Sequence, residues 1–298
     1  HRKDPVYLTT IVGKPPQEDF YLGRATERIF LPLLKTQLPE IVDMDMPVEG
    51  VFHNCVIVSI DKRYPMQSRR LMSALWGLGQ MSFVKTIVTV DADVNVHDYE
   101  KVARILLSTV DFETDLFFSE GILDVLNHAS DQMLYGSKLG IDLTNKIEGE
   151  PGYGEEDPPH ANPPAFPTQE AVIEVSPEVK AVAEIQNSIL LVALDKTVPN
   201  QGKQFIDSFF NHPNFATVEI VIVLEGHVDL TNISIVMWKF FNNIDPKRDF
   251  HFKDDRLGID ATQKFPAEGY QQNWPEEIEM TAEIKTKVDN KWDNLFKG

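Results

Sequence analysis

Short continuous apolar runs alternate with amphipathic stretches along most of this chain. The runs CVIVSI, at 55–60, and SILLVAL, at 188–194, are rich in β-branched residues, and this pattern predicts strands that are covered on both faces. Each run is followed by Asp-Lys and then by apolar residues at helical spacing, such as Leu71, Leu75 and Leu78 in the first case. A second strand follows, KTIVTVD or EIVIVLE. Strands that alternate with helices predict an α/β fold with mixed β-sheets covered by helices.

The same pattern occurs twice. GSKLGIDLTNK and DDRLGIDATQK share Leu-Gly-Ile-Asp-x-Thr-x-Lys at a shift of 118 positions, and a shift of 134 aligns 61–118 with 195–252. Both halves continue with a helix, near 98–110 or 231–243, and a third strand, near 114–118 or 248–252. The shift changes because the first copy holds about sixteen extra residues, around EGILDVLNHASDQMLY. The sequence therefore predicts two tandem copies of one α/β unit, at 51–150 and 184–270.

Segments outside the two units have their own patterns. Residues 1–50 predict a lead-in of a strand at PVYLTTIVG, a helix over 17–38 that is interrupted at Pro32, and a strand at EIVDMDM. The closing segment, 271–298, predicts a helix over 275–296 with an apolar stripe at every fourth residue, namely Met280, Ile284, Val288, Trp292 and Phe296. Such a stripe packs on a core, or, if it is exposed, it indicates an oligomer contact.

The units are joined by a segment of biased composition. Residues 147–179 contain seven prolines and eight acidic residues and no Lys or Arg. This composition favours an exposed, extended chain that forms no helix and buries little apolar surface. We therefore predict an acidic, Pro-rich linker at 151–183.

Charge and cysteine content restrict the class of protein. Forty-six acidic residues against twenty-eight basic ones give a net charge of −18, which disfavours nucleic acid as a partner. The single cysteine, Cys55, excludes an intramolecular disulfide and indicates a reducing compartment, so we expect a cytoplasmic protein. The chain begins at His1, within HRKDP, and we expect it to be a piece of a longer polypeptide.

Most candidate ligand motifs fail on inspection. DADVN, at 91–95, resembles the start of a calcium loop, but Val96 and Val102 stand where that loop needs Gly and Glu. The histidines have no metal-ligand spacing, and no glycine-rich phosphate loop follows any strand. The basic pair Arg69-Arg70 follows the first strand at the start of a helix, where an anion binds readily. This pair is either a phosphate clamp or a solvated basic face.

Five segments together carry a family resemblance. HRKDPVY, PLLKTQLPEIVDMDMPVEG, DKRYPMQSRRLMSALWG, VTVDADVNVHDYEKV and GSKLGIDLTNK resemble, in that order, the C-terminal half of the UbiD decarboxylases, the 3-octaprenyl-4-hydroxybenzoate carboxy-lyase family. The resemblance covers 1–150 and resumes at 255–296. Residues 151–254 have no counterpart in the shorter members of the family.

The resemblance implies a chemistry and a small set of site residues. Members of this family are similar in using prenylated FMN and a divalent metal, Mn or Mg, to remove a carboxylate from aromatic or α,β-unsaturated acids. Arg69 aligns with the family's lysine near the flavin phosphate, so it is the implied cofactor-binding residue. Leu123 and Val125 align with residues that line the substrate pocket, although both also suit an ordinary core. In the second copy Lys203 replaces Arg69 and the pocket segment is absent, so that copy is expected to be a structural duplicate.

The resemblance also implies what this chain lacks and needs. The family's metal ligands and its Glu-Arg-Glu acid–base network precede the segment at which this chain begins. We therefore expect no catalytic residue and no metal ligand here, and no activity from the isolated chain. The implied partners are the protein's own N-terminal and middle domains, an aromatic acid substrate, further copies in a homo-oligomer, and a flavin prenyltransferase that supplies the cofactor.

Two alternatives to the decarboxylase reading stay open at this point. The chain could be a non-catalytic assembly module of UbiD-like ancestry, in which both α/β copies and the terminal helix serve only protein contacts. A free-standing nucleotide-binding protein is the other alternative, and the missing glycine-rich loop argues against it. The sequence identifies neither the acid nor the pathway, whether ubiquinone synthesis or another decarboxylation.

Overall fold

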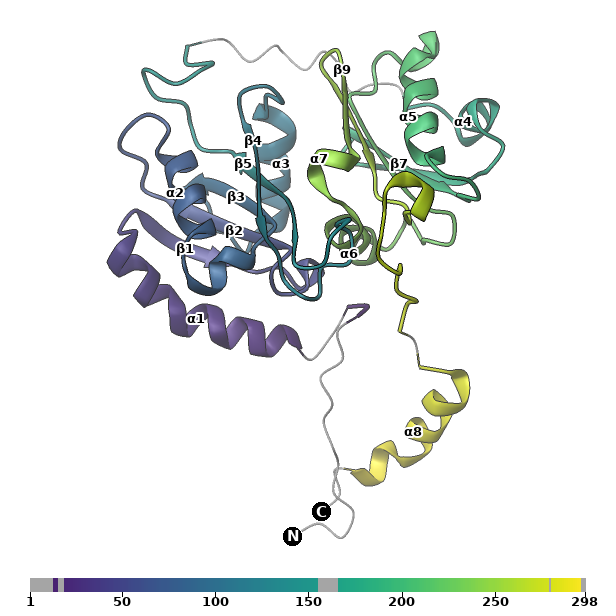
Figure 1. The fold of residues 1–298 in the computed structure, drawn as a ribbon, viewed down its shortest axis with the longest axis horizontal. Helices are drawn as coiled ribbons and strands as arrows, with labels where there is room; N and C mark the ends of the chain where they lie inside the picture. The colour runs from purple at the N-terminus through teal and green to yellow at the C-terminus, as the bar shows by residue number, and fades with distance from the viewer. Residues whose placement is uncertain (1–12, 16–18, 155–165, 279, 296–298) are drawn as a thin grey trace.

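Two five-stranded mixed sheets lie beside each other, and helices cover their faces (Figure 1). The computed structural model describes residues 13–15, 19–154, 166–278 and 280–295. Most of the strand expected at 5–13, and Phe296 of the expected apolar stripe, lie outside the described residues. The two sheets confirm the predicted α/β class with one unit in tandem copies.

The first sheet has the spatial order β1-β2-β3-β5-β4. Its strands β2, β3 and β5 are parallel, and the edge strands β1 and β4 run antiparallel to their neighbours. The strands are β1 Ile41–Asp45, β2 Cys55–Ile60, β3 Thr86–Asp91, β4 Leu116–Ile122 and β5 Tyr135–Asp142, and the helices are α1 Asp19–Gln37, α2 Gln67–Trp76 and α3 Tyr99–Thr109, with short 3-10 helices η1 Val48–Gly50 and η2 Gly79–Phe83.

The second sheet has the equivalent order β6-β7-β8-β10-β9, again with three parallel strands and two antiparallel edges. The strands are β6 Val179–Ile185, β7 Ile189–Leu194, β8 Ile220–Glu225, β9 Phe250–Lys253 and β10 Arg256–Asp260, and the helices are α4 Gln169–Val175, α5 Gln201–Asn211, α6 Ile233–Asn243, α7 Pro246–Asp249 and α8 Ala282–Leu295, with η3 Pro213–Phe215 and η4 Pro266–Glu268. Identical topology in both sheets explains why the sequence pattern recurs.

The repeated Leu-Gly-Ile-Asp motif forms the last parallel strand of each sheet, β5 or β10. A Cβ atom at Gly140 would collide with Sδ of Met72, and one at Gly258 would collide with Cγ2 of Ile206. Met72 and Ile206 belong to α2 and α5, which pack on the two sheets at equivalent places. Glycine is therefore required at this position because the helix approaches the strand backbone closely.

The Asp-x-Thr-x-Lys part of the motif closes the strand with a polar network. Thr144 Oγ1 donates to Asp142 Oδ1 at 2.6 Å, and Thr262 donates to Asp260 in the same way. The motif lysine of the second copy, Lys264, lies 3.4 Å from Asp249, and its counterpart in the first copy pairs with the equivalent aspartate. The repeat is thus a structural signature of this strand end.

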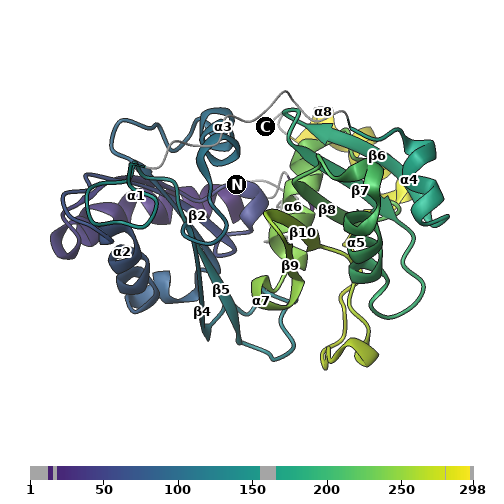
Figure 2. The ribbon, with the colours of Figure 1, turned by 90° about the horizontal axis from the view of Figure 1, so that it is seen from above.

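The two units share one apolar core. Side chains of β4 and β5 pack with side chains of the second sheet in a single buried cluster. Aromatic rings connect the edge strands β4 and β9. The centre of the Phe118 ring, on β4, lies 6.0 Å from the ring centre of Phe250 and 6.2 Å from that of Phe252, both on β9. Helix α6 lies between the sheets (Figure 2), with Val236 in the shared cluster and Phe241 against a cluster of the first unit. The contacts make the two units one packed body.

Three local predictions are wrong. Helix α1 continues through Pro32, which lies on the exposed side of the helix, as does Arg28, the residue four positions earlier whose carbonyl group loses its N–H partner. The stretch expected to be an extended linker contains α4 and the start of β6, where Val172 is fully buried in the core of the second unit. The last helix begins at Ala282 and not near 275, where the sequence predicted its start.

Candidate functional site

Arg69 lies in the first turn of α2, and its guanidinium group points toward the start of β4. Its Nη2 donates to the backbone carbonyl of Thr114, and its Cζ lies 5.6 Å from the centre of the Phe117 ring. The side chain is half-buried, so part of the guanidinium group reaches solvent beside the positive end of α2. The fixed orientation and the partial exposure suit an anion contact. Its counterpart in the second copy, Lys203, is exposed.

The start of α2 already holds one carboxylate of the protein itself. Glu150 Oε1 accepts from the backbone N–H of Met66 at 2.7 Å, and Glu150 Oε2 accepts from Lys62 Nζ at 2.6 Å and from the N–H of Ile147 at 3.0 Å. Burial acts against ionisation, but these hydrogen bonds hold the pKa of Glu150 below its usual value. A phosphate group at Arg69 would therefore bind beside an occupied helix start.

The second copy repeats this arrangement. Glu268 Oε1 accepts from Lys196 Nζ at 2.7 Å and from the N–H of Asn200 at 2.9 Å. Asn200 has a φ of 61° and Met66 has a φ of 62°, so the backbone enters both helices through the left-handed region. The lysine–glutamate pair at the helix start is thus part of the unit and is not specific to the copy with Arg69.

The insertion that distinguishes the first copy extends the β4–β5 hairpin. Within it Leu123 is fully buried, whereas Val125 is 71% exposed. The two residues predicted to line a pocket thus point to different environments. Val125 belongs to an exposed apolar surface, which we call the hairpin face and which consists of Ile122, Val125, Leu126, Met133, Leu134 and Tyr135. Several exposed apolar side chains on one hairpin indicate a binding surface.

Arg69 and the hairpin face lie at opposite ends of β4. Arg69 contacts Thr114, just before β4, and Leu123 follows its last residue. The seven residues of β4, Leu116–Ile122, separate the two contacts by about 20 Å. The structure therefore does not bring the predicted phosphate contact and the predicted pocket residues into one site.

His53 and Asp124 form a hydrogen-bonded pair at the base of the insertion, which sequence reasoning missed. His53 Nδ1 lies 2.6 Å from Asp124 Oδ2, and Asp124 Oδ1 accepts from the N–H of Leu126 at 2.8 Å. Burial opposes ionisation of Asp124, but the hydrogen bond from His53 lowers its pKa. The backbone before His53 is strained, since Val51 and Phe52 have φ values of 42° and 69°. The pair fixes the turn that presents Val125.

The other side of the insertion attaches the first unit to the second. Arg248 Nη1 donates to Asp131 at 2.7 Å, and Tyr270 Oη donates to the carbonyl of His128 at 2.7 Å. His128 Nε2 lies 3.2 Å from Asn243 Oδ1, and Gln272 donates to the carbonyl of Ser130 at 2.7 Å. One feature of the sequence could have indicated these contacts, namely that the insertion occurs in the first copy and not in the second. An insertion that is absent from the second copy is free to pack against it.

The described residues offer little to a metal or to a nucleophilic reaction. Among the residues that the structure describes, no three His, Cys, Asp or Glu side chains are grouped so that they could hold a metal ion. Cys55 is buried, and burial raises the pKa of its thiol, which keeps it protonated. No helix in the described part of the chain is long and apolar enough to span a bilayer.

Solved structures of similar fold are UbiD-class enzymes. The vanillic acid decarboxylase of Sedimentibacter hydroxybenzoicus in its open form is 25% identical, covers 53% of this chain and 35% of its own, and has a TM-score of 0.47. The UbiD-class enzyme HmfF from Pelotomaculum thermopropionicum, in complex with FMN, is 24% identical, covers 45% of this chain and 29% of its own, and has a TM-score of 0.38.

Sequence relatives are longer than this chain. An uncharacterized protein of Helicobacter pylori strain J99 is 34% identical over 305 residues, which cover 98% of this chain and 46% of that protein. An uncharacterized protein of Aquifex aeolicus is 50% identical over 179 residues, which cover 60% of this chain and 34% of that protein. The chain thus spans about half the length, or less, of the curated relatives it matches.

A family model matches both α/β units. The model describes the 3-octaprenyl-4-hydroxybenzoate carboxy-lyase C-terminal domain, and it matches residues 20–143 and 165–268. The match includes most of 151–254, the part for which the sequence resemblance offered no counterpart. Because the match covers more than half of the chain and both of its units, this chain belongs to the UbiD family of carboxy-lyases, as a C-terminal portion.

Proposed function

We propose that the chain is the C-terminal part of a prenyl-FMN-dependent decarboxylase that acts on an aromatic acid of the 4-hydroxybenzoate type or on an α,β-unsaturated acid. The observation that carries this proposal is the match of a carboxy-lyase domain model to both α/β units. Prenylated FMN, when bound, supplies the electron sink for the carbanion that loss of CO2 leaves behind. In this proposal the acid–base carboxylates and the Mn or Mg ligands belong to the rest of the protein.

Two surfaces of the first unit would serve such a site. The hairpin face, with Val125 exposed, offers an apolar wall for a substrate ring, whereas Leu123 is buried. Arg69 offers a guanidinium group to the flavin phosphate, at the other end of β4. Because the length of β4, about 20 Å, separates them, each would contact a different part of the cofactor–substrate assembly.

The decisive test compares this chain with the longer protein that contains it. The long form, purified with a flavin prenyltransferase as the cofactor supplier, should show flavin absorbance and release CO2 from an aromatic acid. The isolated 298-residue chain should do neither. If the long form binds no flavin and is inert, the alternative function as an assembly module takes the place of the decarboxylase.

Arg69→Ala in the long form should weaken cofactor retention. Losing one charge-assisted contact to phosphate costs about 1.5–3 kcal/mol, which is roughly a ten- to hundredfold loss of affinity. Flavin content after gel filtration, measured by absorbance, gives the result. Arg70→Ala is the matched control, because Arg70 is next in sequence but pairs with Glu40. Equal flavin retention in the Arg69→Ala protein and the wild type would remove Arg69 from the cofactor site.

We also propose that α8 mediates a homo-oligomer. Its described side chains, from 282 to 292, are all exposed, and its apolar stripe includes Ile284, Val288 and Trp292, with Met280 just before the helix. In Figure 1 the helix stands away from both sheets. An isolated helix of this length is marginally stable in water, so a second copy that covers the stripe would stabilise it.

Changing the stripe should dissociate this oligomer. Ile284→Asp combined with Val288→Asp places two charges on the apolar face and should shift the mass found by analytical ultracentrifugation to that of the monomer. Lys287→Ala, on the same helix, should leave the mass unchanged. A monomeric wild-type protein, or an oligomer that survives both aspartates, would contradict this role of α8.

A further inference from the structure

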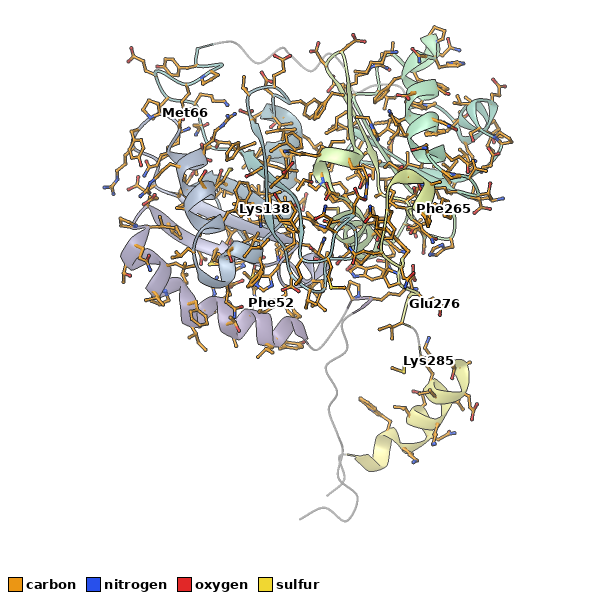
Figure 3. All side chains as sticks on the ribbon, viewed as in Figure 1. Phe52, Met66, Lys138, Phe265, Glu276 and Lys285 are labelled. Atoms are coloured by element: carbon orange, nitrogen blue, oxygen red, sulfur yellow. The ribbon has the colours of Figure 1, made fainter. Side chains whose placement is uncertain are left out.

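A cleft of about 830 Å³ opens at the carboxyl ends of β7 and β8 in the second unit. Its walls come from the ends of these strands, from α6, from the segment 271–278 and from Lys14. Figure 3 shows Glu276, on one wall, where the chain leaves the second unit toward α8. Open α/β sheets bind ligands at the carboxyl ends of their parallel strands, and the volume suits a small organic molecule.

The second copy differs from the first at the residues that line this cleft. At the 134-residue shift, His227 replaces Asp93 and Lys239 replaces Ile105. These two substitutions remove one acid and one apolar side chain and add two basic groups. Lys239 is nevertheless 4% exposed, so its ammonium group needs an anionic partner. The expected structural duplicate therefore has a polar centre of its own.

The carboxylate of Glu277 occupies the centre of this basic group. It pairs with Lys239 Nζ, lies 2.6 Å from Lys14 Nζ and lies 2.9 Å from His227 Nε2. Burial acts against ionisation, yet the hydrogen bonds from these three residues hold the pKa of Glu277 at about 2. The arrangement of Lys14, His227 and Lys239, which we call the basic cradle, thus accommodates a carboxylate.

Most other charges around the cleft are matched elsewhere. Asp195 lies 3.0 Å from Lys180, and Lys196 lies 2.7 Å from Glu268. Glu225 accepts from Asn243 Nδ2 at 3.1 Å and lies 3.4 Å from Lys239. If Glu277 left, His227 would lose this carboxylate, and Lys239 would keep Glu225, at 3.4 Å. A second carboxylate would restore the balance.

An aromatic wall adjoins the cradle. Trp274 lines the cleft, and its ring lies edge to face with His128 at 4.8 Å and with Tyr270 at 5.3 Å. These contacts hold the indole in place beside the carboxylate position. A rigid ring next to a cationic cradle suits a flat acid whose ring can pack on the indole.

We propose that this cleft binds a small aromatic carboxylate, which displaces Glu277 from the basic cradle and releases the segment 271–278 at the base of α8. The site lies in the second unit, away from Arg69 and the hairpin face. It requires no flavin, so it does not depend on the proposed decarboxylase function. The protein's own carboxylate acts as a competitor, and the apparent affinity is the intrinsic affinity multiplied by the fraction of molecules in which Glu277 has left the cradle.

Benzoate binding to the 298-residue chain tests the proposal by isothermal titration calorimetry. Glu277→Gln keeps the shape of the side chain but removes the competing charge, so the dissociation constant for benzoate should fall by at least about tenfold. Glu276→Gln, the adjacent residue on the cleft wall, is the matched control and should bind as the wild type does. Adding Lys239→Met to Glu277→Gln should abolish the gain.

Four results would overturn the proposal or a part of it. Equal affinities for the wild type and the Glu277→Gln protein, or a gain that survives Lys239→Met, would show that the cradle does not hold the ligand. Hydrogen exchange in the wild type supplies a readout without any variant, because saturating benzoate should speed exchange at 271–278. Binding without faster exchange there would refute the displacement. Inorganic phosphate that binds as tightly as benzoate would refute the role of the aromatic wall.

Discussion

Glu150→Ala is expected to lower the free energy of unfolding by about 3–5 kcal/mol, because it leaves the buried ammonium group of Lys62 without its anionic partner. Both side chains of this pair are 3% exposed. The substitution also leaves the N–H groups of Met66 and Ile147 without their acceptor. Urea unfolding followed by circular dichroism measures the loss.

The duplicated unit supplies a second measurement and a control. Glu268→Ala should cost a similar amount, since Lys196 and Glu268 are 2% and 5% exposed in the equivalent place. Glu148→Ala, two residues from Glu150 and exposed, should change stability by less than about 0.5 kcal/mol. If Glu150→Ala lowered the free energy of unfolding by less than about 1 kcal/mol, the ammonium group of Lys62 would be solvated by water or paired with another group in the variant.

Stability is expected to rise steeply with pH between about 7 and 9, because two buried lysines have lowered pKa values. Burial lowers the pKa of Lys85 to about 7 against the attraction of Asp245 and Asp249, and burial lowers the pKa of Lys138 to about 7. In the unfolded chain both titrate near 10.5, so the unfolded state binds more protons across this interval. The free energy of unfolding should then rise by about 1.4 kcal/mol per pH unit for each lysine.

The hydrogen bonds of both lysines fit a neutral amine, and thus a free energy of unfolding that rises with pH. Lys85 Nζ donates to Asn127 Oδ1 at 2.8 Å and to the carbonyl of Ile244 at 3.0 Å, and Lys138 Nζ donates to two backbone carbonyls. A neutral amine has the two N–H groups that these bonds require. Lys85→Met should remove about half of the slope in urea titrations at pH 7, 8 and 9, and the exposed Lys35→Met should remove none. A flat profile in the wild type would mean that both amines stay charged.

Local periodicity was sufficient to predict most regular elements. The buried strands β2, β3, β7 and β8 read as continuous apolar runs because helices or the other unit cover both faces. The strands β5 and β10 were missed as strands, although their motif was noticed, because a glycine and charged residues interrupt the apolar pattern. Composition did not predict helix α4. Its seven residues follow a Pro-rich segment, and Val172 within it is buried in the core.

The site was less predictable than the fold. The position of Arg69 in the first turn of α2 followed from the strand–helix pattern, but its contact with Thr114 did not. Leu123 and Val125 have similar side chains and close positions, and only the turn held by His53 and Asp124 decides that one is buried and the other exposed. That pair joins residues 71 positions apart, which no local pattern reports.

The sequence by itself determined the α/β class, the duplication and the family, because periodicity and motif order are properties of neighbouring residues. The tertiary structure decided which carboxylate meets which lysine, from Glu150 at the start of α2 to Glu277 in the basic cradle. The reason is physical. A buried charge requires a partner of opposite sign, but the identity of that partner depends on which distant segments the packed core brings together.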